Sequence, residues 1–573
     1  MLKRLKSVSM MLFLMGASTG AAYAVSNPGI TDVKVAQQDG ACTGIVKDAT
    51  GETVIGASVV VKGTTNGTIT GIDGDFSLSN VKKGDVIVIS FVGYISQEIV
   101  WDGKPVNVTL KDDTQTLDEV VVVGYGTQKK VNVTGAVGMV DSKVIAARPV
   151  QNVSQALQGV IPGLNLTVGN SGGSLDGEMN INIRGTGTIG DGSGSSPLVL
   201  IDGIEGNLNT VNPNDIESVS VLKDAASASI YGARASFGVI LVTTKSGKSG
   251  KTNVNYSGNV RFNDAIGIPE LMDSYTFAQY FNRASSNRGG GDIFSPAVME
   301  RIKAYQEGTL TATTVDNGSG IWQKWANANG NTDWFGEFYD NWVPSQEHNL
   351  SISGGTEKLQ YVLSGSFLDQ KGLLRHGTDK FQRYTLNSKI TANITDWLKV
   401  TLNSKWTRED FQRPTYLTSS FFHNLARKWP VHPAYDPNGF PMDEGEIEQM
   451  ENGGEQNSQK DYYTNQLHVV IEPIKNWRIN LEGSVRTTTQ YQHWEVLPVH
   501  AYDVNGDPYY TVWDMGYGSY SAGSSRVDEY SWKENYYTTN IYSDYFKQFD
   551  NGHYFKVMAG FNAELYKNRS IEA

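Results

Sequence analysis

The stretch from residue 250 to residue 573 alternates apolar and polar positions with a period of two over most of its length. Leu359, Tyr361, Leu363 and Phe367, for example, alternate with the polar Gln360, Ser364 and Ser366. A period of two is the side-chain period of a β-strand, and segments of about ten such residues are typical of transmembrane β-barrels. A soluble β-sandwich produces a similar alternation, so the pattern alone predicts strands without deciding between these two architectures.

The lengths of the connections separate the two alternatives. After a strand at 254–262, eight further strand candidates are paired by tight turns near residues 354–355, 393–396, 472–476 and 548–552. The segments between these hairpins are mostly long, at 264–347, 410–460 and 493–534, with a shorter one at 369–380. Outer-membrane barrels have this arrangement, with short turns on the periplasmic side and long loops outside. Trp397 and Trp477 stand beside tight turns, where an interfacial aromatic girdle would lie.

The predicted strand count is odd, and the last candidate, at 554–566, would end on the side of the long loops. A bacterial single-chain barrel needs an even, closed set of strands, because an open edge in lipid leaves backbone groups without hydrogen bonds. We therefore expect this chain to be the front part of a longer protein. A barrel of this plugged kind has about 22 strands when complete, of which about 9 are present here.

The stretch from residue 41 to residue 111 alternates short strands with turn signals such as Asp73-Gly74-Asp75. We expect its strands at 43–47, 58–62, 67–70, 76–78, 86–91, 97–101 and 106–110. Strands at this spacing predict a small β-sandwich. Cys42, the single cysteine of the chain, excludes an internal disulfide framework and is expected to be a packed strand residue.

The stretch from residue 128 to residue 246 mixes strands with short helices, which predicts an α/β unit. Asn152 or Ser154 is placed to cap a short helix that Gly159 and Pro162 end. We expect strands at 164–168, 181–183, 197–201, 219–222 and 239–243. The glycines at 185–190 fit a dinucleotide-binding pattern, but the polar segment after them cannot open the helix that would hold a pyrophosphate, so nucleotide binding is not expected.

Four consecutive valines, Val120–Val123, stand at the boundary between these two units, within residues 112–127. Valine is stiff at χ1 and favours strands. Two interpretations are open at this point. The segment is either the last strand of the preceding unit or a peptide that adds itself as an extra strand to an open sheet edge of a partner.

The start of the chain reads as a secretory signal over residues 1–24, with a basic start, an apolar core and Ala22-Tyr23-Ala24 as the cleavage site. The net charge of −12, without a basic cluster, argues against nucleic acid as a partner. The eight histidines show no zinc-ligand spacing, and no catalytic constellation is present. We expect no enzyme activity, no metal site and no cofactor.

The boundary segment resembles the TonB-box region of SusC/RagA-type TonB-dependent outer-membrane transporters. The residues that carry this resemblance are Asp118, Glu119, Val120, Val121, Val122, Val123, Gly124 and Tyr125. Residues 41–111 resemble the carboxypeptidase-regulatory-like domain, a transthyretin-like sandwich. Residues 128–246 are similar to the plug domain of the same family, whose motif positions here are Arg184, Gly185, Asp202, Gly203, Lys223, Asp224, Tyr231, Gly232 and Arg234. Ser236 and Phe237 depart from the Ala or Asn usual in the family.

The resemblance implies a mainly β protein with a sandwich, an α/β plug and the first part of a transmembrane antiparallel β-barrel at 250–573. It implies import of a glycan, or less often a peptide, across the outer membrane. The implied partners are the TonB–ExbB–ExbD complex, a SusD-like surface lipoprotein and outer-membrane lipid. By the same analogy Arg184 and Arg234 are expected to be buried charges paired with the barrel wall.

Two alternatives to glycan import stay open: a surface-exposed glycan-binding or adhesion protein, and a receptor for a siderophore or another small nutrient. Eight tryptophans are expected in the long loops, where they either stack on sugar rings or pack within the loops; they are Trp322, Trp325, Trp334, Trp342, Trp429, Trp494, Trp513 and Trp532. The transported ligand and the residues that contact it cannot be derived from the sequence.

Overall fold

The computed structural model describes residues 41–573, except 49–50, 65, 92–93, 112–119, 124–125, 130–135, 149, 169–173, 176, 186–195, 512, 515–518, 521–522 and 550–552. The expected signal sequence, Asp118, Glu119, Gly124, Tyr125 and most of the glycine pattern at 185–190 lie outside the described residues. The chain divides into two compact units, residues 1–119 and 120–573. Each unit is described by itself.

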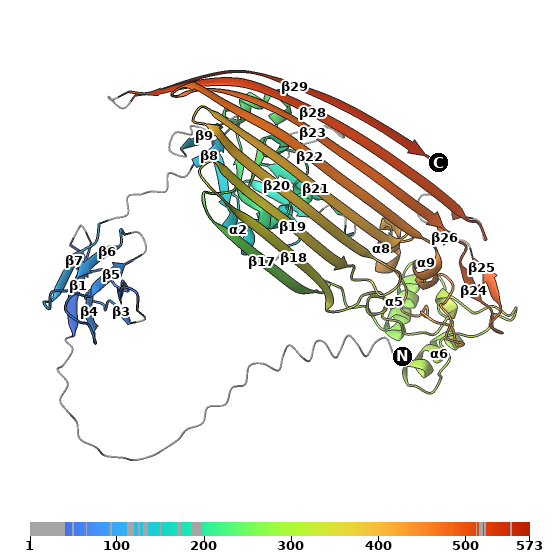
Figure 1. The fold of residues 1–573 in the computed structure, drawn as a ribbon. Coiled ribbons are helices and arrows are strands. Elements are labelled where there is room, and N and C mark those ends of the chain that lie inside the picture. The colour runs from blue at the N-terminus through green and yellow to red at the C-terminus, as the bar shows by residue number, and fades with distance from the viewer. Residues whose placement is uncertain are drawn as a thin grey trace, which may run out of the picture. The chain divides into compact units, whose positions relative to one another are not determined.

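The first unit is a two-layer β-sandwich of strands β1–β7, drawn in blue in Figure 1. Its strands are β1 (Cys42–Lys47), β2 (Ser58–Val61), β3 (Gly67–Ile69), β4 (Asp75–Leu78), β5 (Val86–Ser90), β6 (Gln97–Val100) and β7 (Val106–Thr109). One sheet has the order β4-β1-β7 and the other β3-β2-β5-β6. Alternate residues of both sheets, Cys42 among them, point into one hydrophobic core that Trp101 also joins. The seven strands expected from the sequence are present.

The second unit begins with a hairpin of β8 (Val120–Val123) and β9 (Gly126–Lys129), in which Val120 is opposite Lys129. A five-stranded sheet of order β10-β15-β16-β13-β14 follows. Its strands are β10 (Val137–Asp141), β13 (Leu198–Ile201), β14 (Ile204–Glu205), β15 (Ile216–Leu222) and β16 (Val239–Thr244). A separate hairpin is formed by β11 (Leu164–Val168) and β12 (Met179–Ile183). We call residues 136–249 the α/β segment.

Short helices connect these strands: α2 (Ser142–Ala146), α3 (Val153–Leu157), η2 (Leu208–Thr210), η3 (Pro213–Asp215), α4 (Ala225–Ala228) and η4 (Ser229–Ala235). Asn152, and not Ser154, caps α3, because its side chain accepts the amide hydrogen of Gln155 at 2.9 Å. Helix α3 and the central strands share one buried core. The core fixes the positions of the turns that leave the sheet, and these turns carry the site described below.

The largest element is a nine-stranded antiparallel sheet in which neighbours in sequence are neighbours in space (Figure 1). Its strands are β17 (Gly250–Asn263), β18 (Val343–Gly355), β19 (Leu359–Lys371), β20 (Lys380–Thr395), β21 (Leu398–Pro414), β22 (Glu455–Ile474), β23 (Trp477–Val496), β28 (Arg526–Gln548) and β29 (Tyr554–Glu572). The expected number of strands and the alternation of short turns with longer connections are both observed. Most strands are longer than expected, because they continue into the loops beyond the apolar stretch that the sequence pattern shows.

The long connections pack together at one end of this sheet, and we call them the outer loop cluster. It contains α5 (Ser274–Asn287), α6 (Pro296–Gln306), η5 (Trp325–Asn327), α7 (Trp334–Phe338), α8 (Ser419–Ala426), α9 (Ile447–Asn452), β24 (His500–Tyr502), β25 (Pro508–Tyr510), β26 (Trp513–Asp514) and β27 (Ser519–Tyr520). Two tryptophans expected in loops lie in long strands instead, Trp494 in β23 and Trp532 in β28. Trp334 is fully buried and Trp342 is 70% exposed, so the loop tryptophans do not share one role.

Within the described part of the chain, none of the helices has both the length and the apolar character needed to cross a membrane.

Candidate functional site

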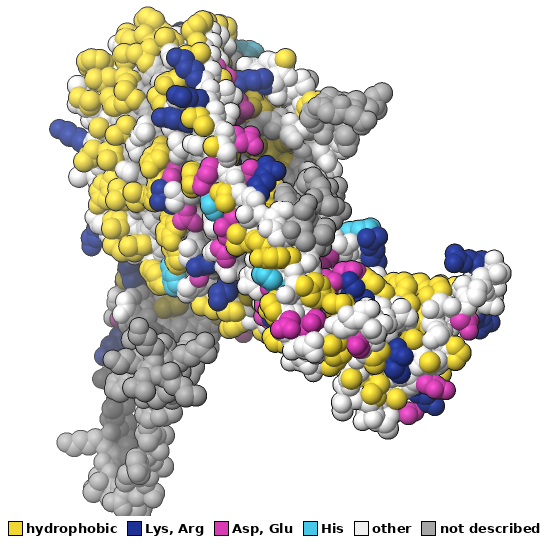
Figure 2. Space-filling model, turned by 90° about the vertical axis from the view of Figure 1, so that its right-hand side faces the viewer, with side chains coloured by type: hydrophobic (Ala, Val, Ile, Leu, Met, Phe, Trp, Pro, Cys, Tyr) yellow, Lys and Arg dark blue, Asp and Glu magenta, His cyan; other side chains and the backbone are white. Residues whose placement is uncertain are grey.

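The two faces of the nine-stranded sheet have opposite chemistry. One face carries exposed apolar side chains, including Val254, Leu350, Leu363, Leu386, Leu402, Leu467, Val485, Ile541, Phe561 and Leu565. The other face is polar and buried, with Asn349, Ser364, Asn387, Asn403, Gln466, Asn480, Ser484 and Asn540. A soluble sheet buries its apolar face, whereas this sheet exposes it and buries the polar one. Figure 2 shows the extent of hydrophobic surface on one side of the molecule.

The apolar face is bounded along the strands by aromatic and then charged residues. Near the short turns, Trp397 and Trp477 are exposed. Toward the long loops, Trp406 lies 6.4 Å from Tyr463, ring centroid to ring centroid. The next outward position on β21 is Arg408, which forms an ion pair with Asp461 at 2.8 Å. From Trp397 to Trp406 the strand rises roughly 30 Å, which after the usual tilt of barrel strands leaves an apolar band about 25 Å tall.

A first group of contacts between the polar face and the α/β segment centres on the turn between β13 and β14. Asp202 and Gly203 form this turn with positive φ angles of 50° and 88°. The left-handed backbone suits glycine and, among other residues, Asp or Asn. It directs the Asp202 carboxylate toward the end of β16, where the Thr244 amide donates to Oδ1 at 2.9 Å and the Thr244 hydroxyl donates to Oδ2 at 2.7 Å.

The same carboxylate receives three side chains from the nine-stranded sheet. Lys405 forms an ion pair with it, Lys389 approaches Oδ1 at 3.4 Å, and the Asn403 amide donates to Oδ2 at 3.0 Å. Burial by itself would raise the pKa of Asp202, but the two lysine charges and the Lys405 hydrogen bond outweigh it and hold that pKa below its usual range. Asp202 is therefore an ionised, buried link between the α/β segment and strands β20 and β21.

Further contacts continue from this turn along the sheet. The Gln466 amide donates to the backbone oxygen of Asp202 at 2.9 Å, and Arg486 donates to the backbone oxygen of Glu205. Arg234 donates from both terminal nitrogens to the Glu564 carboxylate of β29, each at 2.6 Å, and from one of them to Glu205 at 3.1 Å. Strands β20, β21, β22 and β23 thus contact the β13–β14 hairpin, and β29 contacts Arg234, which pairs with Glu205 of that hairpin.

A second group of contacts holds the segment around η2. Arg383 of β20, which is buried, donates to the backbone oxygen of Asn209 at 2.7 Å and to that of Gln151 at 2.5 Å. The Thr407 hydroxyl donates to the Thr210 oxygen at 2.9 Å, and the Asn212 side chain donates to Asn349 at 2.6 Å. Side chains of the sheet thus satisfy backbone groups of the α/β segment, which otherwise would be buried without partners.

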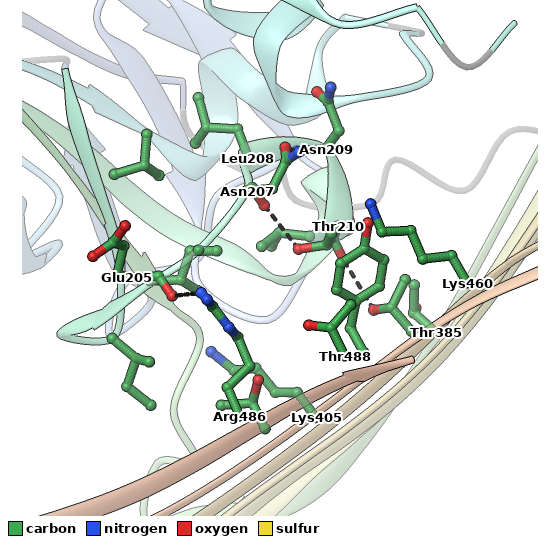
Figure 3. A pocket seen from close by; sticks show the side chains of 18 of the residues that line it. Glu205, Asn207, Leu208, Asn209, Thr210, Thr385, Lys405, Lys460, Arg486 and Thr488 are labelled. Atoms are coloured by element: carbon green, nitrogen blue, oxygen red, sulfur yellow. Dashed lines mark hydrogen bonds between the residues drawn. The ribbon is translucent and has the colours of Figure 1, made fainter. Parts of the chain in front are cut away.

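A cavity of about 510 Å³ lies between the two groups of contacts. Figure 3 shows Lys405, Lys460 and Arg486 reaching from the sheet toward strand β14, which carries Glu205, and toward η2. The lining also includes the carboxylates Glu178, Asp215 and Glu534, so that charges of both signs are mixed. A polar cavity of this kind admits water or a small neutral polar molecule.

The remaining motif positions stabilise the α/β segment itself. Asp224 caps α4 through the Ser227 amide at 2.9 Å and also accepts the Ala136 amide at 2.5 Å, and these hydrogen bonds lower its pKa, that of Ala136 first. Lys223 donates to the backbone oxygen of Pro162 at 2.6 Å. Tyr231 packs against a small hydrophobic cluster that includes Leu198. Gly232 has a φ of 66°, a conformation that favours glycine.

The structure corrects one expectation for this group. Arg184 is exposed and lies with Gly185 in a left-handed turn, at φ of 59° and 95°. It is therefore not a buried charge paired with the sheet, because the turn after β12 directs it to the surface. Arg234 does pair with the sheet, but its side chain is 44% exposed.

The wall residues Arg383, Lys389, Lys405 and Arg486 are contacts that sequence analysis missed. Each stands at a polar position of an alternating strand, where a cation looks like any solvated residue. The signal that could have identified them is the reversed chemistry of the sheet: once the apolar face is outside, cations on the polar face must be inside and need partners.

His432 is a fully buried histidine of the outer loop cluster. His432 stacks on Trp325, with ring centroids 4.6 Å apart and ring planes 15° apart, and its Nε2 lies 3.1 Å from the backbone oxygen of Asp443. Burial, together with the charges of Lys428 and Lys324, lowers the pKa of His432 to about 3. The side chain is neutral at physiological pH and serves as a packing residue.

Comparison with known proteins defines the class. Residues 129–239 match the TonB-dependent Receptor Plug Domain, and residues 42–122 match the CarboxypepD_reg-like domain. The α/β segment is thus a plug domain, and the nine-stranded sheet corresponds to part of the barrel of a TonB-dependent receptor.

More particularly, the chain is a homologue of the TonB-dependent receptor SusC of Bacteroides thetaiotaomicron, with 37% identity over 375 residues, 63% of this chain and 33% of SusC. A TonB-dependent receptor of Formosa agariphila is 33% identical over 393 residues, 68% of this chain and 34% of that protein. The chain spans about a third of the length of these relatives. The solved RagAB peptide importer in its "open-open" state has the same fold, with a TM-score of 0.63 and 24% identity over 79% of this chain and 50% of that one.

Proposed function

We propose that this protein takes part in TonB-dependent import across the bacterial outer membrane. The observation that carries the proposal is the sheet with an exposed apolar band on one face and a plug domain on its polar face. Such a sheet is suited to lipid outside and to a closed, polar pathway inside. The chain supplies the plug, the plug-binding wall and the outer loop cluster, and the proposal concerns the complete barrel.

The energy for import would enter through the segment at 117–125. In the structure, Val120–Val123 form strand β8, which pairs with β9 in a two-stranded sheet. A two-stranded hairpin alone is marginally stable, and β8 has a second edge to which a TonB strand can add. The roles proposed for Asp118, Glu119, Gly124 and Tyr125 rest on the motif alone.

A backbone substitution tests this step. In the complete barrel, Val122→Pro removes a backbone donor and disturbs strand pairing, so energised uptake should collapse while the outer-membrane level and ligand binding stay near wild type. Val122→Ile, the matched control, should be close to neutral. If Val122→Pro instead lowers the amount of folded protein while uptake per molecule is preserved, the segment is a structural strand.

The proposed ligand is a glycan or a peptide, because the relatives include SusC and the neighbours include the RagAB peptide importer. A SusD-like lipoprotein is the proposed partner on the side of the outer loop cluster. Binding measured against panels of oligosaccharides and peptides, with and without such a lipoprotein, tests the ligand class. A ligand that binds equally well without the lipoprotein would exclude a lid role for it.

The second class of function, an adhesion protein, has to be distinguished from an importer by experiment. An adhesin needs neither a plug nor an energised step, so its binding and cell association would be unchanged by a protonophore. Accumulation of labelled ligand inside the outer membrane that stops when the proton gradient is dissipated supports import. Uptake of an iron-loaded siderophore but of no glycan or peptide would place the protein with small-nutrient receptors instead.

A further inference from the structure

Helix α7 contacts two buried histidines of the outer loop cluster. At its start, the Trp334 ring stacks on His432, with ring centroids 5.9 Å apart and ring planes 20° apart. At its end, Glu337 lies 3.1 Å from His376 Nε2, and the Phe338 ring lies edge-on to the same imidazole, with ring centroids 5.3 Å apart. His432 is 0% and His376 is 5% exposed. Since the two histidines belong to the β21–β22 and β19–β20 connections, α7 joins both of these to the β17–β18 connection that contains it.

His376 lies between two carboxylates. Its Nε2 is 3.1 Å from Glu337 Oε1, and its Nδ1 is 2.7 Å from Glu451 Oε1 of α9. An ionised carboxylate only accepts hydrogen bonds, and a neutral imidazole has a single N–H to donate. Both contacts are hydrogen bonds at the same time only if both ring nitrogens carry a proton, which gives the ring a positive charge. The geometry of the site therefore selects the charged form of His376.

His432 requires the opposite protonation state. Its Nδ1 accepts the backbone amide hydrogen of Trp325 at 3.4 Å, and its Nε2 donates to the backbone oxygen of Asp443 at 3.1 Å. These contacts need one bare nitrogen and one N–H, so the ring is neutral. A second proton would point an N–H at the Trp325 amide and would add a charge beside those of Lys428 and Lys324.

The charged groups around the two rings are paired with one another. Around His432 the ion pairs are Lys428 with Glu446 at 2.8 Å, Lys324 with Asp443 at 2.6 Å and Lys324 with Glu444 at 2.7 Å. Around His376 the remaining contacts are Arg375 with Asp340 at 2.9 Å and the Tyr435 hydroxyl with Glu337 at 3.0 Å. Carboxylates, lysines and arginines ordinarily keep their charges between about pH 5 and pH 9, so the histidine rings are the groups that titrate there.

We propose that His376 and His432 form a proton-sensitive clamp on α7, closed when His376 is charged and His432 is neutral. When the pH rises and His376 loses a proton, a ring lone pair faces a carboxylate, and the contact with Glu337 or Glu451 becomes repulsive. When the pH falls and His432 gains a proton, its contact with Trp325 becomes repulsive instead. The clamp thus joins the three connections most tightly near neutral pH. This inference goes beyond import and does not depend on the ligand.

Two backbone amides report on the two histidines separately. The Arg375 amide, one residue before His376, donates at 2.8 Å to the backbone oxygen of the last residue of α7. The Thr332 amide donates at 2.8 Å to the backbone oxygen of Pro430, two residues before His432. Hydrogen exchange at both amides is measured on the assembled barrel from pH 5 to pH 9 and is corrected for the intrinsic effect of pH on exchange.

The wild type should show its greatest protection at both amides near neutral pH. The Arg375 amide should lose roughly tenfold in protection from pH 7 to pH 9, because the ring gives up a charged hydrogen bond to a carboxylate. The Thr332 amide should lose about twentyfold in protection from pH 7 to pH 5, because His432 takes up a proton that the folded site disfavours.

Glu451→Gln distinguishes the clamp from a merely structural histidine. A glutamine side chain can donate to the bare Nδ1 of a neutral ring, so this variant should keep its protection and lose the alkaline dependence. The Glu451 side chain is 43% exposed, and the variant should therefore fold. His376→Gln should lower the protection of the Arg375 amide at pH 7 and also remove its alkaline dependence. His432→Gln should abolish the acid dependence at Thr332 only.

His493→Gln is the matched control. His493 also lies between two carboxylates, with Glu529 at 2.7 Å and Glu495 at 3.7 Å, but its side chain is 30% exposed on β23. The variant should leave both reporting amides unchanged. Equal protection of the wild-type Arg375 amide at pH 7 and pH 9, or an alkaline loss that persists in Glu451→Gln, overturns the clamp. The measurement needs only the folded barrel, so its result is separate from that of the import experiments.

Discussion

Replacing Asp202 by Asn is the most informative single change at the boundary between plug and sheet. The amide keeps the shape of the side chain and an acceptor for the Thr244 amide. It removes the charge that compensates Lys405 and Lys389, whose side chains are only 18% and 13% exposed. Breaking a buried ion pair by removing one partner costs about 3–5 kcal/mol, because the remaining charge stays buried. We expect a loss near 3 kcal/mol in the free energy that holds the β13–β14 turn.

Hydrogen exchange of the assembled barrel measures this loss locally. A change of about 3 kcal/mol corresponds to an increase in opening of roughly a hundredfold, and it should appear at the amides of Ile204 and Thr244. Glu564→Gln is the matched control, since it also removes a carboxylate that joins plug and sheet. Its partner Arg234 is 44% exposed and keeps Glu205, so the loss should stay below about 1 kcal/mol.

A double variant distinguishes charge from shape. Lys405→Met in the Asp202→Asn background removes the stranded cation and should restore part of the protection. The pH dependence has a defined sign. Because the folded pKa of Asp202 is lowered, its contribution is complete above the unfolded value of about 3.9 and falls away only below it. The difference between wild type and Asp202→Asn should be flat from pH 8 to pH 5. Exchange in Asp202→Asn within threefold of wild type at pH 7 would refute the reasoning.

Three further predictions concern other parts of the chain. Since the pKa of His432 falls from 6.5 to about 3 on folding, the outer loop cluster should lose about 2 kcal/mol between pH 7 and pH 5; His432→Gln should abolish this dependence, as followed by tryptophan fluorescence under denaturant. Residues 41–111, which form their own two-sheet core, should fold alone and unfold cooperatively by circular dichroism; a non-cooperative transition would contradict an independent domain. Mass spectrometry of envelope protein should find the mature N-terminus after Ala24, and an intact Met1 would rule out the expected cleavage.

The local pattern of apolar, polar and turn residues determined most of the secondary structure of this protein. The sandwich strands follow from short apolar runs between turn residues, and the long sheet follows from alternation and connection lengths. The plug strands are set by β-branched apolar runs such as those at 219–222 and 239–243, and Asn152 caps the start of α3 by a contact only three residues away. These features depend on residues near one another in sequence, which is why the sequence predicts them.

The ion pairs and hydrogen bonds between the plug domain and the nine-stranded sheet depend on the tertiary structure alone. Asp202 meets Lys405 across 203 positions of sequence, and Arg234 meets Glu564 across 330. The alternation of apolar and polar residues predicts that a strand has two different faces. Only the packed structure decides which face is buried and which polar residue lies opposite which carboxylate. The exposure of Arg184 has the same origin, since a left-handed turn after β12, and not its residue type, sets its direction. Charge pairs formed by strand register and by a domain docked on a sheet have no local signature.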